Sequence, residues 1–63
     1  MTLPELSTAR VLRQVGAVPA GTIGTIVHVY PGGKVYEVEF YSVTIGSAWH
    51  AVETVEAADL EAT

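Results

Sequence analysis

Two runs of β-forming residues joined by a Pro-Gly-Gly turn place the strongest limit on what this chain can fold into. The first run, TIGTIVHVY (22–30), is β-branched and aromatic almost throughout, which suits a half-buried pleated strand. The second run, KVYEVEFY (34–41), alternates in side-chain character with a period of two. Pro31 presets φ, and the two glycines after it accept positive φ. The two runs therefore predict a β-hairpin.

The alternation assigns the side chains of the second run to two faces. Successive side chains of a strand point to opposite sides of a sheet. We place one set in the core: Tyr36, Val38 and Phe40. We place the other set on the water side: Val35, Glu37, Glu39 and Tyr41. Gly24, inside the first run, indicates a bulge, a bend or a close backbone approach.

Further strands are predicted on both sides of this hairpin. Residues 9–15 predict a first strand, and residues 48–55 predict a fourth, joined to the hairpin by residues 42–47. The facing of the fourth strand stays open, so Trp49 is assigned to neither face. The end of the chain suits a short 3₁₀ turn and a brief strand, with Leu60 as the inward anchor. The alternative is a longer helix, which alanine, glutamate and leucine all favour. Short strands spaced by turn signals predict an all-β fold, a small five-stranded barrel.

The length of 63 residues allows one small domain, with residues 1–8 as an N-terminal lead-in and residues 9–63 as the barrel. Such a domain buries only about 60% of the surface of its unfolded chain. The chain has no cysteine, which excludes a disulfide and a thiolate metal site and fits a cytoplasmic protein. Partners or self-association are therefore expected to add stability.

Charge and hydropathy limit the classes of partner. The formal net charge is −4, and the chain has only three basic residues, so nucleic-acid binding is not expected. The start of the chain lacks a basic segment followed by an apolar one, so no secretory signal is expected. No apolar run approaches the roughly 20 residues that span a bilayer, so no membrane association is expected.

The segment AGTIGTIVHVYPGGKVYEVEF, followed later by Asp59 and Leu60, resembles a family of small bacterial proteins of unknown function with an SH3-like barrel fold. The resemblance implies that fold and no established activity, with a larger partner often encoded nearby. Similar strands occur in the KOW modules of ribosomal and transcription proteins and in SH3-like subunits and activators around nitrile hydratase. Where the family has an acidic, Gly-containing turn after its VEF motif, this chain has YSVTIG (41–46).

Residue types that support catalysis are few. Glu37 and Glu39 share a strand face about 7 Å apart, where solvent screens both carboxylates. His28 and His50 lie on different predicted strands without metal-ligand spacing. We therefore predict no catalytic site, no metal site and no cofactor, and a protein that is not an enzyme.

The remaining hypothesis is a small non-catalytic protein-interaction module: an accessory, immunity or antitoxin-like partner of a protein encoded nearby. The predicted partner-binding residues are Glu37, Glu39, Tyr41, Val43, Ile45 and Trp49. The same apolar residues could instead pair with a second copy, giving a homodimer, or bend inward and plug the barrel. The alternative functions are a KOW-like nucleic-acid or ribosome-associated module and a scaffold or activator of a nitrile-hydratase-like metalloenzyme.

Overall fold

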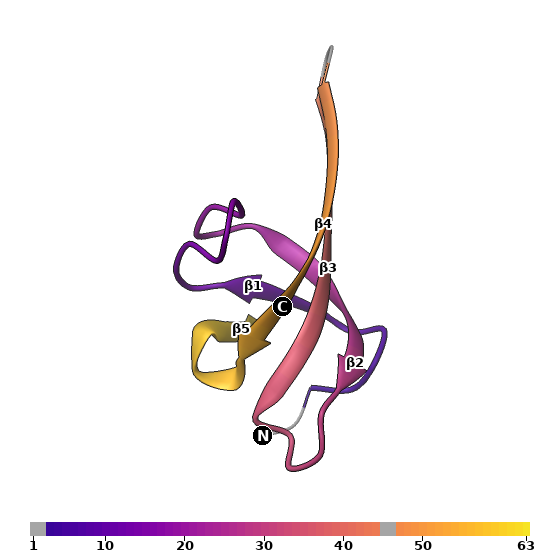
Figure 1. Cartoon of the computed structure of the whole chain (residues 1–63), viewed down its shortest axis with the longest axis vertical. Coiled ribbons are helices and arrows are strands. Elements are labelled where there is room, and N and C mark those ends of the chain that lie inside the picture. The colour runs from indigo at the N-terminus through magenta and orange to yellow at the C-terminus, as the bar shows by residue number, and fades with distance from the viewer. Residues whose placement is uncertain (1–2, 45–46) are drawn as a thin grey trace.

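The computed structural model describes residues 3–44 and 47–63, without the side chains of residues 42–48, and contains five strands (Figure 1). The elements are β1 (Thr8–Val11), β2 (Ile23–Val29), β3 (Val35–Thr44), β4 (Ser47–Glu56), the 3₁₀ turn η1 (Ala57–Asp59) and β5 (Leu60–Ala62). Within these described residues, no helix is long and apolar enough to cross a membrane.

All five strands belong to one antiparallel sheet. Their order is β4-β3-β2-β1-β5, so β1 lies between β2 and β5. The predicted all-β class and the five strands are confirmed. β4 and β5 are the two edges, and no pairing between them closes the sheet in the described part of the chain. Closure into a barrel therefore stays a prediction.

The strand boundaries differ from the predicted ones at two places. β1 ends at Val11, because the following residues form a separate loop closed by a bridge between Val15 and Val18. β3 continues to Thr44 and stays in register with β4, where a linker was predicted. Residues 42–47 were predicted to join the two strands, but β-branched valine and threonine in positions 43 and 44 suit a paired strand.

One side of the sheet holds the core. Its buried hydrophobic residues, among those described, are Leu3, Ala9, Val11, Val18, Ile26, Tyr36, Val38, Phe40, Val55 and Leu60. The predicted inward set of β3 is confirmed, because all three of its side chains are fully buried. The predicted anchor Leu60 is buried as well. The bulge of β2 falls between Ile26 and His28, whereas Gly24 makes a close approach to the core face of β3.

The segment predicted as a lead-in is attached to the core. The Leu6 amide donates to the Ile26 carbonyl at 2.6 Å, and the Ile26 amide donates to the Ser7 carbonyl at 2.8 Å. Leu3 is buried, and its amide donates to the Tyr36 hydroxyl at 3.0 Å. Residues 3–7 therefore cover one end of the sheet before β1 begins at Thr8.

The Tyr36 hydroxyl makes two hydrogen bonds that predict a measurable effect of its removal. It accepts from the buried Leu3 amide and donates to the Gly33 carbonyl at 3.0 Å. Tyr36→Phe leaves the Leu3 amide without its partner, so we expect a loss of about 1–3 kcal/mol in the free energy of unfolding, measured by urea titration. The control Tyr41→Phe, at an exposed side chain, should change it by less than about 0.5 kcal/mol. Equal effects would contradict the anchoring role of Tyr36.

Candidate protein-interaction surface

Polar and aromatic side chains lie together on the solvent side of β2, β3 and β4. The β3–β4 register pairs Glu37 with Thr54, Glu39 with Val52 and Tyr41 with His50. The β2–β3 register brings His28 beside Glu37. We call this surface the outer face, and its residues are His28, Tyr30, Glu37, Glu39, Tyr41, His50, Val52 and Thr54.

Glu37 is held in a hydrogen-bonded cluster at one end of the outer face. Its Oε1 accepts from the Tyr30 hydroxyl at 3.1 Å and from the Thr54 hydroxyl. The hydrogen bond to Glu37 raises the pKa of Tyr30 above its usual value. The rings of His28 and Tyr30 meet edge to face, with their centroids 4.8 Å apart. These contacts orient the Glu37 carboxylate and fix the Tyr30 ring beside it.

Glu39 forms the second carboxylate position of the outer face. Its Oε2 lies 2.9 Å from His50 Nε2, and both side chains are about half exposed. An exposed pair of this kind contributes at most about 1 kcal/mol to stability. The pairing instead holds the carboxylate next to the neighbouring apolar residues of the same face.

Two apolar side chains beside these carboxylates are open to solvent. Tyr41 is 68% exposed and Val52 is 47% exposed. Val43 is two residues after Tyr41 in β3, and its backbone pairs with Ala48. Its side chain lies outside the described part of the structure. Ile45, also predicted as a partner-binding residue, lies outside the described residues altogether.

Trp49 lies on the opposite face from Tyr41. It pairs with Ser42, one residue away from the Tyr41–His50 pair, and side chains of successive residues alternate between faces. With Val18 and Ala51 it lines a pocket of about 300 Å³ beside the loop between β1 and β2. The six predicted site residues are therefore not one surface. Glu37, Glu39 and Tyr41 come together, and Trp49 belongs to the other side.

The β4 residues of the outer face were missed at the sequence level. His50 was weighed only as a metal ligand, and Val52 and Thr54 were not singled out as site residues. These residues are placed by the register between β3 and β4. In every pair of this register the two residue numbers add up to 91, as for Tyr41 and His50. The register depends on which residues form the turn of the hairpin, and a predicted linker over residues 42–47 did not fix that position.

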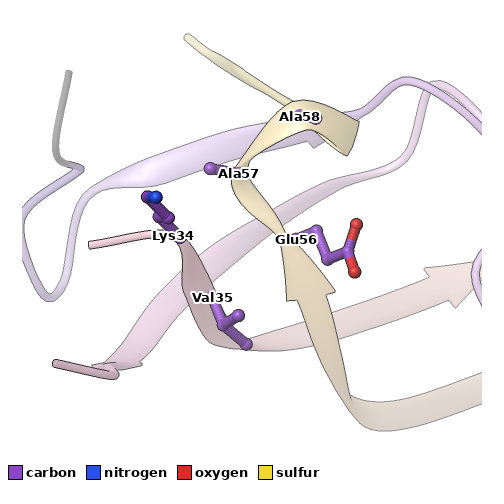
Figure 2. Close-up of a pocket in the computed structure, with 5 residues that line it drawn as sticks. All are labelled: Lys34, Val35, Glu56, Ala57 and Ala58. Atoms are coloured by element: carbon purple, nitrogen blue, oxygen red, sulfur yellow. The ribbon is translucent and has the colours of Figure 1, made fainter. Parts of the chain in front are cut away.

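A second shallow pocket, of about 430 Å³, lies where β3 begins and β4 ends (Figure 2). Its lining residues are Lys34, Val35, Glu56, Ala57 and Ala58. Figure 2 shows the Lys34 ammonium and the Glu56 carboxylate pointing away from each other. The two charged groups therefore do not converge on a bound molecule, and the remaining lining is apolar.

Two further kinds of site were considered from the described side chains: a basic site for an anionic ligand and a metal site. Arg10 Nη1 lies 3.0 Å from Glu61 Oε1, and Arg13 Nη2 lies 2.8 Å from Asp59 Oδ2. The hydrogen bond and charge of Asp59 raise the pKa of Arg13 further above its usual value. Within residues 3–44 and 47–63, no three His, Asp or Glu side chains are grouped so as to hold a metal ion.

Comparisons with known proteins do not assign the chain to a family. No family model matches it, and no curated protein and no solved structure matches it significantly.

Proposed function

We propose that the protein is a small non-catalytic protein-interaction module with an SH3-like barrel fold, an accessory, immunity or antitoxin-like partner of a protein encoded nearby. The observation that carries the proposal is that Tyr41 and Val52 are both exposed on the outer face, beside the oriented carboxylates of Glu37 and Glu39. Exposed apolar groups inside a polar border are typical of interfaces, and a tyrosine is a common anchor residue.

The strand order supports the SH3-like assignment. β1 pairs with both β2 and β5, and η1 is the only link between the edge strands β4 and β5. A small twisted sheet with this order brings its two edges toward each other, which is how five-stranded barrels protect their edges.

The charge of the surface favours a basic protein partner. The net charge of the chain is −4, and both carboxylates of the outer face lie beside its apolar centre. Such a rim attracts a basic surface and speeds its association, and salt weakens the effect. Nucleic acid suits the protein less well, because the carboxylates of Glu61 and Asp59 neutralise Arg10 and Arg13.

The proposal predicts that Tyr41→Ser abolishes partner capture without destabilising the fold. Tyr41 is exposed, so the thermal midpoint should stay close to that of the unaltered chain. Loss of an anchor residue weakens an interface by about 2 kcal/mol or more, which is about 30-fold in Kd. The measurement is capture of a specific protein from native lysate, followed by titration with the purified partner at two salt concentrations.

The matched control for this experiment is Leu12→Ser. Leu12 is also exposed, but it follows β1 and lies off the outer face. It should capture the partner as well as the unaltered chain does. If Tyr41→Ser binds with unchanged affinity, or if association does not weaken with salt, the outer face is not the interface.

A further inference from the structure

Of the two edge strands in the described part of the chain, β4 has the longer free edge. β4 has ten residues and stands at the end of the strand order, so only β3 pairs with it in the described part of the chain. Figure 1 shows the β3–β4 hairpin extending well beyond the other strands. The molecule measures 40 Å along its longest axis and about 20 Å across. The far half of β4, residues 47–50, therefore pairs with β3 alone, and the loop between β1 and β2 lies beside Trp49 and His50.

One hydrogen bond identifies the groups on that edge. The Ala57 amide donates to the Lys34 carbonyl at 2.8 Å, which makes these two residues a hydrogen-bonded pair of the β3–β4 ladder. Hydrogen-bonded and non-hydrogen-bonded pairs alternate along an antiparallel ladder. The odd-numbered residues of β4 therefore bond to β3. The even-numbered residues direct their N–H and C=O groups to the free edge: Ala48, His50, Val52, Thr54 and Glu56.

The sequence of the far half of this edge lacks two features that prevent strand pairing, charged side chains and proline. Proteins protect edges with charged side chains, proline or bulges. Residues 41–52 contain no Asp, Glu, Lys, Arg or Pro, although the chain has ten charged residues. In the described residues, the pairing of β3 with β4 is continuous from the Glu39–Val52 pair to the Thr44–Ser47 pair. A two-stranded ribbon is at best marginally stable in water, and this one exposes Tyr41 and Trp49.

We propose that a second copy of this chain pairs with β4 along this edge, antiparallel and across a twofold axis, to make one continuous sheet. A twofold axis brings the same strand of both copies together. Antiparallel pairing points the two hairpins in opposite directions, so the rest of each molecule lies at the opposite end of the paired strands.

The sequence of this edge permits a second copy as the occupant, because residues 41–52 carry no Asp, Glu, Lys or Arg. Two chains of net charge −4 repel each other if their bodies touch, but here the uncharged segments meet. If the twofold axis passes between His50 and Val52 of β4, Glu53 lies opposite a residue between 47 and 51 of the second copy. All of those residues are uncharged, so Glu53 does not meet a second carboxylate. The proposal does not depend on the outer-face interface, because edge pairing uses backbone groups and leaves Tyr41 free.

Sedimentation equilibrium and amide hydrogen exchange test the pairing together. From about 10 μM to about 1 mM, the mass should rise from 6.7 kDa towards twice that value. The amides of His50 and Val52 should exchange freely in dilute solution and become at least tenfold slower as the dimer forms. The amides of Trp49 and Ala51, which bond to β3, should stay protected throughout.

Val52→Pro removes an edge amide that β3 does not use, and it should weaken dimerisation at least tenfold. The matched control Val52→Thr keeps this amide and should dimerise normally, as should Tyr41→Ser. If the proline variant melts early, Val52→Lys tests the same edge with a charge. Three results would each overturn the proposal. The first is a mass that stays at 6.7 kDa up to about 1 mM, and the second is protection of the edge amides in the dilute monomer. The third is a dimer that neither Val52→Pro nor Val52→Lys weakens.

Discussion

Phe40→Ala is expected to leave the protein largely unfolded at room temperature. Phe40 is fully buried in the middle of β3, and its ring lies directly over Gly24 of β2. Removing a buried phenylalanine ring costs about 3–5 kcal/mol, because the apolar contacts are lost and a cavity remains. A domain of this size without a disulfide or a metal has a total stability of only about 3–5 kcal/mol. The substitution therefore removes most or all of the margin.

Urea and thermal unfolding followed by circular dichroism measure this effect. The matched control is Glu39→Ala, one residue earlier on the opposite face. The Glu39 side chain is exposed and bonds to the exposed His50, so its loss should cost at most about 1 kcal/mol. Two equally mild variants would show that the two faces of β3 are assigned the wrong way round.

The hairpin and the facing of its second strand could be predicted because they depend on local sequence. The alternation over residues 34–41 settles which side chains of β3 are buried, and Pro31 with its two glycines marks the turn. The 3₁₀ turn and the brief strand after it were also predicted correctly, with Leu60 inward.

Features that depend on distant contacts could not be predicted. Leu3 enters the core through a hydrogen bond to Tyr36, which is 33 residues away, and no local pattern marks it. The bridge between Val15 and Val18 ends β1 early, although Leu12 and Val15 themselves suit a strand. Closure of the sheet is a similar case, because it depends on how β4 and β5 approach each other in space.

Only part of the candidate surface could be predicted, because the rest depends on how two strands pair. Glu37, Glu39 and Tyr41 follow from the alternation of one strand. The strand across from them follows only from the register, which depends on the length of the hairpin. Trp49 was left unassigned on those grounds, and the register places it on the opposite face from Tyr41.

Gly24→Ala is expected to destabilise the protein by about 3 kcal/mol, at the upper end of the range for overpacked cores. A Cβ atom at Gly24 would lie 2.7 Å from Phe40 Cδ1, 2.7 Å from Val38 Cγ1 and 2.8 Å from the Glu39 carbonyl oxygen. The side chains could shift, but the carbonyl is part of the backbone of β3. Gly24 is therefore required because β2 and β3 approach closely there, and Gly24→Val should not fold.

A double-mutant cycle separates crowding from a general loss of stability. Val38→Ala removes the Cγ1 atom that the new methyl group would contact, so the pair Gly24→Ala and Val38→Ala should cost less than the sum of the two single changes. Gly21→Ala is the contrasting variant. No atom lies within 4 Å of a Cβ there, and its φ of 91° imposes only backbone strain of about 1–2 kcal/mol. Additive energies for the first pair, measured by urea titration, would mean that Gly24 is not required for close packing.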